Sequence, residues 1–461
     1  MYAPENFTVF VTGTTGFLGK VVLEELSRRF EECRLRKIIV LLRPSKSHCA
    51  QDRFYLEVAA SPCFSRLHPQ WCDKIEVVQG DLTEENCGLH EQTRQRIFPE
   101  ITHIINCAAS VAFDLPLIDA TIANVGSAMN LLRFATDCPK LRALVTTSTS
   151  YVAPITDSAI RPTVVPLPYR ASELYRNILD DRVDEAALLK ETGYPNTYTL
   201  TKCLAEHIYL AYKQMFPIKI IRPSIISCAW KYPSPGWIDS KAAVAGFVAL
   251  IGAGYLKAID ARGQAILDVV PVDAVVNDII REAGLVSSSP NTSTDASGCD
   301  KIAPENDISF IHSVAGIKRG LRISELAATT VRVFKDIPQS QATINFRKPS
   351  VKYLGPRNAK FHMYDIGTQR LPLFLAACCF DLRRKHKMAG KTRALSKVVK
   401  KINTVFPYYT ERTFDFEPGV WTLDLNVSEG VSEKEECLGR FTPEKYAELI
   451  CKGVKRNLLK M

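Results

Sequence analysis

The first half of the chain alternates short apolar runs with amphipathic segments. Continuous rather than alternating apolar runs are typical of parallel strands that are buried on both faces. Helical segments are expected between the runs, at about 17–30, 88–98 and 119–135. This order predicts a doubly wound parallel sheet with its site at the carboxyl ends of the strands. The predicted strands are FTVFVT (7–12), KIIVLL (37–42), IEVVQG (75–80), HIINCA (103–108), ALVTTS (143–148) and IKIIRP (218–223).

The pattern changes after about residue 335. Before that point, FIHSV (310–314) reads as a further strand and ISELAATTVRVF (323–334) as a helix. The polar segment 286–307 is therefore interpreted as a surface loop and not as a domain boundary. We predict a Rossmann-like NADP-binding domain over 1–335, which includes the catalytic and substrate-binding residues, and a smaller, mainly helical domain over 336–461.

The composition and charge of the chain indicate a two-domain intracellular protein and argue against nucleic-acid binding. The chain has 461 residues, enough for two domains, with 46% apolar and 23% charged residues. The net charge of +10 is spread too widely to indicate nucleic-acid binding, although it suits an anionic substrate or membrane surface. The cysteines form no CxxC pair and no metal-ligand cluster, which predicts reduced thiols, no metal and an intracellular protein. No signal peptide and no membrane-spanning run is expected.

The motif TGTTGFLG (12–19) lies between the first predicted strand and helix. Its first glycine allows a sharp turn, the second lets the backbone approach a pyrophosphate, and the third allows close packing of helix and strand. The helix amino terminus offers free N–H groups to phosphate. The motif predicts a dinucleotide site that includes Gly13, Thr15, Gly16, Phe17, Leu18 and Gly19.

The second predicted strand ends in LLRPSK (41–46). NAD-selective sites usually have an acidic residue there, which binds the ribose 2′-hydroxyl. This chain has Arg43 instead, with Lys46 nearby, and a guanidinium can pair with a 2′-phosphate. The sequence therefore favours NADPH over NADH; the alternative is a solvated arginine after a strand.

Two further segments are expected near the cofactor. GDL (80–82) places Asp81 and Leu82 after the third strand, where the carboxylate suits adenine recognition, although an aspartate that forms a turn is an alternative. NCAA (106–109) places Asn106 and Ala108 after the fourth strand, where small residues allow the cofactor to approach.

The catalytic candidates come from YTLTK (198–202), which places Tyr198 and Lys202 on one face of a helix running to about residue 212. An ammonium beside a phenol stabilises the phenolate and moves the pKa of the tyrosine from about 10 toward neutral. The lysine can also bind the nicotinamide ribose. A hydroxyl from TTSTSYV (146–152) should complete the set, and strand alternation alone leaves Ser148, Thr149 and Ser150 open.

These motifs resemble those of extended short-chain dehydrogenase/reductases, and more narrowly those of fatty acyl-CoA reductases with a male-sterility-type NAD(P)-binding domain. The resemblance covers most of residues 5–335. Its most specific parts are GFLG (16–19) and PGWID (235–239). The other matching segments are TGTTGFLGKVVLEEL (12–26), IIVLLRPSKS (38–47), GDLTEENCGL (80–89), IINCAASVAFD (104–114), STSYV (148–152), YTLTK (198–202), IIRPSII (220–226) and DVVPVDAVVNDII (268–280).

The resemblance implies an enzyme that uses NADPH to reduce a long-chain acyl-CoA through an aldehyde to a primary alcohol. It assigns the catalytic hydroxyl to Thr149, with Ser148 as its neighbour, and places Pro223 and Ser224 beside the nicotinamide. It also implies an acyl-chain and membrane-associated role for the carboxy-terminal domain, in which this chain departs from the family pattern.

Three other functions share parts of this pattern. An aldehyde-forming thioester reductase would release its product after one hydride transfer. A nucleotide-sugar epimerase or dehydratase has the same fold and Tyr–Lys pair, but it usually has an acidic residue at the position of Arg43 and lacks PGWID. A non-enzymatic NADP sensor would not need Tyr198 and Lys202 together.

A membrane contact is expected near residues 370–401. LPLFLAACCF (371–380) is too short to cross a bilayer and is followed by a basic run. An apolar element beside clustered cations can enter one leaflet and bind anionic headgroups. The expected location is intracellular, at the cytosolic face of the endoplasmic reticulum or peroxisomal membrane. A core helix followed by a solvated face is the alternative. The basic residues are Arg383, Arg384, Lys385, Lys387, Lys391, Arg393, Lys397, Lys400 and Lys401.

Overall fold

The computed structural model describes residues 6–154, 158–286, 308–335, 348–417 and 440–460. The chain forms two compact units. The first comprises Met1–Ser224, Val272–Val314 and Glu417–Leu423, and the second comprises Ile225–Pro271, Ala315–Phe416 and Asp424–Met461. The division expected at residue 335 differs from this one, because segments 225–271 and 315–335 pack with the carboxy-terminal helices and not with the sheet.

The first unit is built on a seven-stranded sheet in the order β11-β6-β5-β4-β1-β2-β3. Every neighbouring pair is parallel. The order reverses between β1 and β4, which is where open α/β sheets bind ligands beyond the carboxyl ends of their strands. The strands are β1 (Phe7–Thr12), β2 (Leu35–Leu42), β3 (Ile75–Gln79), β4 (His103–Asn106), β5 (Ala143–Thr147), β6 (Ile218–Pro223) and β11 (Ile308–Ser313).

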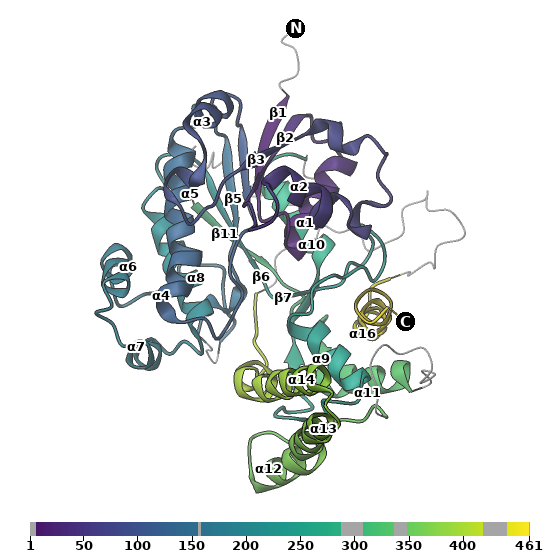
Figure 1. The fold of residues 1–461 in the computed structure, drawn as a ribbon. Helices are drawn as coiled ribbons and strands as arrows, with labels where there is room; N and C mark the ends of the chain where they lie inside the picture. The colour runs from purple at the N-terminus through teal and green to yellow at the C-terminus, as the bar shows by residue number, and fades with distance from the viewer. Residues whose placement is uncertain (1–5, 155–157, 287–307, 336–347, 418–439, 461) are drawn as a thin grey trace, which may run out of the picture. The chain divides into compact units, whose positions relative to one another are not determined.

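Helices cover both faces of this sheet, with α1 and α10 on one face and α5 and α8 on the other (Figure 1). Both faces of the strands are therefore buried, which explains their continuous apolar sequences. The helices of this unit are α1 (Phe17–Arg28), α2 (Ala50–Arg53), α3 (Glu91–Ile97), α4 (Leu117–Thr121), α5 (Ser127–Thr136), α6 (Ala171–Leu179), α7 (Glu185–Thr192), α8 (Thr197–Leu210) and α10 (Val272–Glu282), with the short turns η1 (Phe54–Ala59), η2 (Pro62–Phe64), η3 (Trp71–Lys74), η4 (Glu85–Gly88) and η6 (Ser150–Val152).

The predicted Rossmann-like fold is confirmed, and each predicted strand is present within a few residues of its expected bounds. The fourth strand ends at Asn106 and not at residue 108. The helix expected over 119–135 is interrupted by a π-helical segment, η5 (Ile122–Gly126), between α4 and α5. Most of the loop expected over 286–307 lies outside the described residues.

The second unit combines three two-stranded sheets with helices. Its core forms where α9, α11 and α16 pack together, and here Trp230 and Tyr446 are fully buried. The Tyr446 hydroxyl donates a 2.8 Å hydrogen bond to the Cys228 carbonyl. The elements are β7 (Ile225–Ser227), α9 (Ala243–Gly252), β8 (Ala258–Ile259), β9 (Ile266–Leu267), β10 (Val269–Pro271), β12 (Leu321–Arg322), α11 (Ile323–Phe334), β13 (Lys352–Tyr353), α12 (Ala359–Asp365), η8 (Ile366–Arg370), α13 (Leu371–Leu382), α14 (His386–Val405), α15 (Pro407–Thr410), α16 (Pro443–Gly453) and η9 (Val454–Leu458).

The apolar run expected at 371–380 forms α13, which packs against the basic helix α14. Only Leu373 and Ala377 of α13 are buried, so it is not an ordinary core helix. Across the described parts of the chain, no helix is both long enough and apolar enough to cross a bilayer.

Candidate active site

The glycine motif forms a tight turn between β1 and α1. Gly13 has φ +77°, and a Cβ there would lie 2.6 Å from the backbone nitrogen of Ala108. A Cβ on Gly19 would meet the Gly13 carbonyl. The amino end of α1 is not capped by a side chain, and N–H groups at a helix amino end favour an anion. This turn has the geometry of a pyrophosphate-binding loop; Thr15, Phe17 and Leu18 lie on it or in the first turn of α1.

Arg43 and Asp81 lie side by side beyond the carboxyl ends of β2 and β3. The Arg43 Nη1 atom is 3.7 Å from the Asp81 Oδ2 atom, and the Arg43 side chain is 65% exposed. The other Asp81 oxygen accepts hydrogen bonds from the backbone N–H and hydroxyl of Thr83. Asp81 therefore forms a turn and also faces Arg43, while Lys46 is exposed.

The next cofactor candidates have structural partners within the first unit. Asn106, at the end of β4, accepts a 2.6 Å hydrogen bond from the Thr12 hydroxyl and donates to Thr146. Its side chain thus fixes the carboxyl ends of three adjacent strands, β1, β4 and β5. The backbone of Ala108 packs against Gly13. Leu82 is buried, and its carbonyl accepts from Asn130.

Helix α8 carries the tyrosine and lysine of the predicted catalytic pair. It begins after Asn196, whose side chain accepts a 3.0 Å hydrogen bond from the Thr199 N–H and caps the helix. Tyr198 lies in the first turn, with its ring 5.4 Å from that of Phe113. Lys202 is 7% exposed and its Nζ donates a 2.7 Å hydrogen bond to the Thr147 carbonyl at the end of β5. The pair therefore faces the carboxyl edge of the sheet.

The pKa values of the pair shift in opposite directions. Burial raises the pKa of Tyr198 to about 12, against the effect of its hydrogen bond with Thr149. Burial lowers the pKa of Lys202 to about 8, against the opposing effect of the Glu206 carboxylate. The sequence had predicted a downward shift for the tyrosine, and in this structure the shift is upward. Near neutral pH the phenol is therefore protonated, which is the form that donates a proton.

The candidate hydroxyls of Thr149 and Ser148 differ in their hydrogen-bond partners. Thr149 hydrogen-bonds with Tyr198 and lies 3.5 Å from the carbonyl oxygen of Pro223, at the end of β6. The Ser148 hydroxyl is buried and has no hydrogen-bond partner among the described residues. Ser224 follows Pro223, and its N–H donates to the Ser313 carbonyl. Of these two hydroxyls, Thr149 is thus the one in contact with Tyr198.

Two residues of this site were not predicted from the sequence. Asn124 lies in η5, where it accepts from the Ser110 N–H and donates a 3.1 Å hydrogen bond to Thr201 of α8. Tyr209 lies two turns beyond Lys202, and Asn106 and the Thr146 hydroxyl both donate to its buried phenol oxygen. A polar residue in the apolar pattern of 119–135 was the available signal for Asn124.

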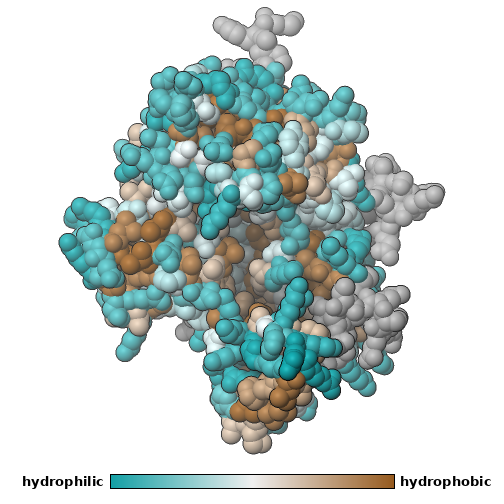
Figure 2. Space-filling view, in the orientation of Figure 1, coloured by the Kyte–Doolittle hydropathy of each residue, from teal (hydrophilic) through white to brown (hydrophobic). Residues whose placement is uncertain are grey.

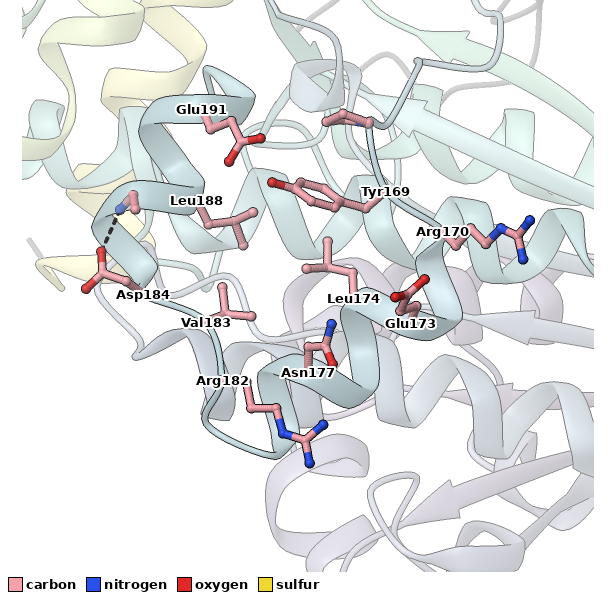
Figure 3. Close-up of a pocket in the computed structure, with 12 residues that line it drawn as sticks. Tyr169, Arg170, Glu173, Leu174, Asn177, Arg182, Val183, Asp184, Leu188 and Glu191 are labelled. Carbon is pink, nitrogen blue, oxygen red and sulfur yellow. Dashed lines mark hydrogen bonds between the residues drawn. The ribbon is translucent and has the colours of Figure 1, made fainter.

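A pocket of about 550 Å³ lies between α6 and α7 and contains none of the predicted site residues. Tyr169, Leu174 and Leu188 point into it, whereas Arg182 points away (Figure 3). The part of the chain that the structure describes also contains no cluster of three or more metal-ligating side chains.

Comparison with known proteins identifies the family. Residues 11–279 match the family model described as male sterility protein. The chain belongs to this family. Fatty acyl-CoA reductase 1 from Homo sapiens is 30% identical to this male sterility family member over 99% of the chain and 85% of its own length. Fatty acyl-CoA reductase 2 from Mus musculus is 27% identical, with the same coverage of both proteins. The chain is thus an NAD(P)-dependent oxidoreductase.

Solved structures support the fold of this male sterility family member. The terminal R domain of the myxalamid biosynthetic pathway matches 99% of the chain and 92% of its own length, with a TM-score of 0.63 and 20% identity. UDP-N-acetylglucosamine 4-epimerase from Methanobrevibacter ruminantium matches with a TM-score of 0.53 and 12% identity. Identities this low show a shared fold alone.

The different contacts of Thr149 and Ser148 predict different effects on kcat when each hydroxyl is removed. We expect Thr149→Val to lower kcat by about 10²–10³, because it removes a donor at the developing oxyanion. Ser148→Ala should have a much smaller effect. Steady-state kinetics would measure both, with Thr149→Ser as the control that retains the hydroxyl. Circular dichroism would check the fold, and the opposite ranking would assign the catalytic hydroxyl to Ser148.

Proposed function

We propose that this chain is an NADPH-dependent fatty acyl-CoA reductase that converts a long-chain acyl-CoA through an aldehyde to a primary alcohol. One observation carries the proposal. The Tyr198–Lys202 pair and the Thr149 hydroxyl meet at the carboxyl ends of β5 and β6, in a chain that fatty acyl-CoA reductases match over nearly its full length.

The residues present fit a dinucleotide. The Gly13 turn brings backbone close to the end of β4 and leaves no room for a side chain, and the amino end of α1 offers N–H groups to the pyrophosphate. Arg43 is exposed beyond β2, with Asp81 3.7 Å away. We infer that Arg43 binds a 2′-phosphate, assisted by Lys46, and that Asp81 binds the adenine. Pro223 and Ser224 are proposed to lie beside the nicotinamide.

Bound NADPH supplies a hydride for each of two successive reductions. In the first, Tyr198 and Thr149 donate hydrogen bonds to the thioester oxygen as negative charge develops on it. Breaking of the carbon–sulfur bond then releases CoA as the thiolate and leaves an aldehyde. In the second, Tyr198 transfers its proton to the alkoxide oxygen, while the Lys202 ammonium stabilises the phenolate that remains. The same groups serve both steps because charge develops on the same oxygen.

The product distinguishes this function from its nearest rival. With a long-chain acyl-CoA we expect mainly primary alcohol, with about two NADPH consumed for each CoA released, as two hydride transfers require. Gas chromatography of the extracted product, with absorbance assays of NADPH and free thiol, would measure both quantities. Tyr198→Phe provides the inactive control. Aldehyde that persists with NADPH in excess, at one NADPH per CoA, would instead establish an aldehyde-forming thioester reductase.

Cofactor choice is proposed to depend on Arg43. Arg43→Glu should weaken NADPH use ten- to a hundredfold, because it removes a charged hydrogen-bond partner of the 2′-phosphate, worth about 1.5–3 kcal/mol, and adds repulsion. The NADH kinetics should change little. Arg36→Glu, at the amino end of the same strand, is a matched control. Unchanged kcat/KM for NADPH in Arg43→Glu would exclude Arg43 from the cofactor site.

We also propose that the second unit binds a membrane surface through α12 and α13. Hydrophobic side chains gather on the surface around these helices (Figure 2). Met363 of α12 is 73% exposed, and Phe374 and Leu382 of α13 are 63% and 85% exposed. Exposed apolar patches of this kind are typical of interaction surfaces.

Cations border this apolar surface. Arg383, Arg384 and Lys385 follow α13 directly and are exposed. Apolar side chains can enter a leaflet while adjacent lysines and arginines bind anionic headgroups. A long-chain acyl-CoA partitions into membranes, so docking would bring the protein to its substrate. The proposed location is the cytosolic face of the endoplasmic reticulum or peroxisome.

Vesicle sedimentation would test this surface. We expect binding to vesicles of phosphatidylserine and phosphatidylcholine at low salt, reduced by high salt and by omission of the anionic lipid. Phe374→Glu/Leu375→Glu should abolish binding, because it places charge on the exposed apolar surface. Leu56→Glu is the control, since Leu56 is 60% exposed in η1 of the first unit. Equal, negligible binding of the wild-type protein under all conditions would contradict the proposal.

A further inference from the structure

Helix α8 buries a second charged residue one turn beyond the catalytic lysine. Tyr198, Lys202 and Glu206 are each four residues apart, so they share one face of the helix. Glu206 is only 3% exposed. A carboxylate is seldom buried without a partner, so its environment needs an explanation.

Arg222 of β6 holds this carboxylate with two hydrogen bonds. Its Nε donates to Oε1 of Glu206 at 2.9 Å, and its Nη2 donates to Oε2 at 2.6 Å. Arg222 is fully buried, and its Nη1 donates to the Thr163 carbonyl at 2.8 Å. The guanidinium also lies 4.5 Å from the centre of the Phe310 ring. The position and orientation of the Glu206 carboxylate are therefore fixed from the sheet.

Lys202 and Glu206 line the same small pocket, which has a volume of about 20 Å³. The charges of buried groups are screened much less than charges in water. Glu206 is the main group that opposes the effect of burial on the pKa of Lys202. Buried ion pairs contribute little to stability on balance, so an electrostatic role beside the active site accounts better for this one.

The other titratable groups around Lys202 are uncharged near neutral pH. Burial raises the pKa of Cys107, at the end of β4, to about 12, and it also raises the pKa of Tyr209 on α8. Tyr198 is likewise protonated, with a pKa of about 12. Among the described residues that act on Lys202, Glu206 is thus the source of negative charge.

We infer that Glu206, held in place by Arg222, is a positioning residue that keeps Lys202 in the ammonium form over the pH range in which Tyr198 donates its proton. The inference rests on the proposed function only in that the Tyr198–Lys202 pair supplies the proton of a carbonyl reduction. Without the carboxylate, the strongest influence that opposes burial is lost, so the pKa of Lys202 falls further from its usual value. The ammonium is then lost at a lower pH.

The pH profile of kcat/KM would test this role. NADPH-dependent reduction of decanal isolates the second hydride transfer and its proton. In the wild-type protein we expect activity to fall above about pH 8, where Lys202 loses its proton. In Glu206→Gln this alkaline limb should move down by about one pH unit or more, which corresponds to a tenfold change in proton affinity. Glu206→Asp should restore part of the shift.

Two further variants separate an electrostatic role from a structural one. Glu206→Gln/Arg222→Gln removes both charges, so no buried guanidinium is left unpaired, and its alkaline limb should move in the same direction but by less than in Glu206→Gln. Asp278→Asn is the matched control, because Asp278 is a buried carboxylate 2.9 Å from Arg281 in the same unit that does not line the Lys202 pocket. Its alkaline limb should match that of the wild type.

Distinct results overturn the inference and the proposed function. A pH-independent loss of kcat, with the alkaline limb unmoved in Glu206→Gln and in the double variant, would show that the pair is structural and overturn the inference alone. A folded wild-type protein that reduces neither decanal nor acyl-CoA with NADPH would overturn the proposed function, and this inference with it.

Discussion

The contact between two backbones at the centre of the sheet determines where this protein can place its site. The turn at Gly13 lies against the peptide that joins Cys107 to Ala108, and this is the point at which the strand order reverses. At the same place, the Asn106 side chain of β4 hydrogen-bonds to Thr12 of β1 and to Thr146 of β5. A side chain at residue 13 would push β1 from β4 and separate the surfaces that a dinucleotide must bridge.

Two buried charged side chains attach helix α8 to the same edge of the sheet. Lys202 bonds to the end of β5, and Glu206 bonds to Arg222 of β6. Both contacts attach α8 to the sheet by groups that need partners when they are buried. Glu206, which holds the helix in place, therefore also acts on the charge of Lys202.

Most of the first unit could be predicted because its strands are buried on both faces and its glycine motif has one common structural context. Phe7–Thr12, Leu35–Leu42 and Ile218–Pro223 were recognisable from local sequence alone. The cofactor and catalytic candidates converge on one edge for the same reason. The roles of Thr149 and Ser148 were not separable, since neighbouring hydroxyls differ only in the direction they face.

Other features depend on contacts between distant parts of the chain. The upward shift in the pKa of Tyr198 results from burial, which a Tyr–Lys spacing does not encode. The pairing of Glu206 with Arg222 depends on how helix α8 packs against strand β6, which no local sequence pattern shows. The division into units was also beyond local patterns, because segments 225–271 and 315–335 resemble parts of a Rossmann domain in sequence but pack elsewhere.

That division limits how the gene can be recombined. The chain leaves the first unit after Ser224, re-enters it at Val272 and leaves it again after Val314. No single crossover between two homologous genes can therefore exchange one whole unit and keep the other intact. A chimera joined near residue 335 would combine segments 225–271 of one parent with the carboxy-terminal helices of the other, inside one core. Residues of segments 225–271 and of the carboxy-terminal helices that pack against each other in that core are thus expected to vary together among homologous proteins.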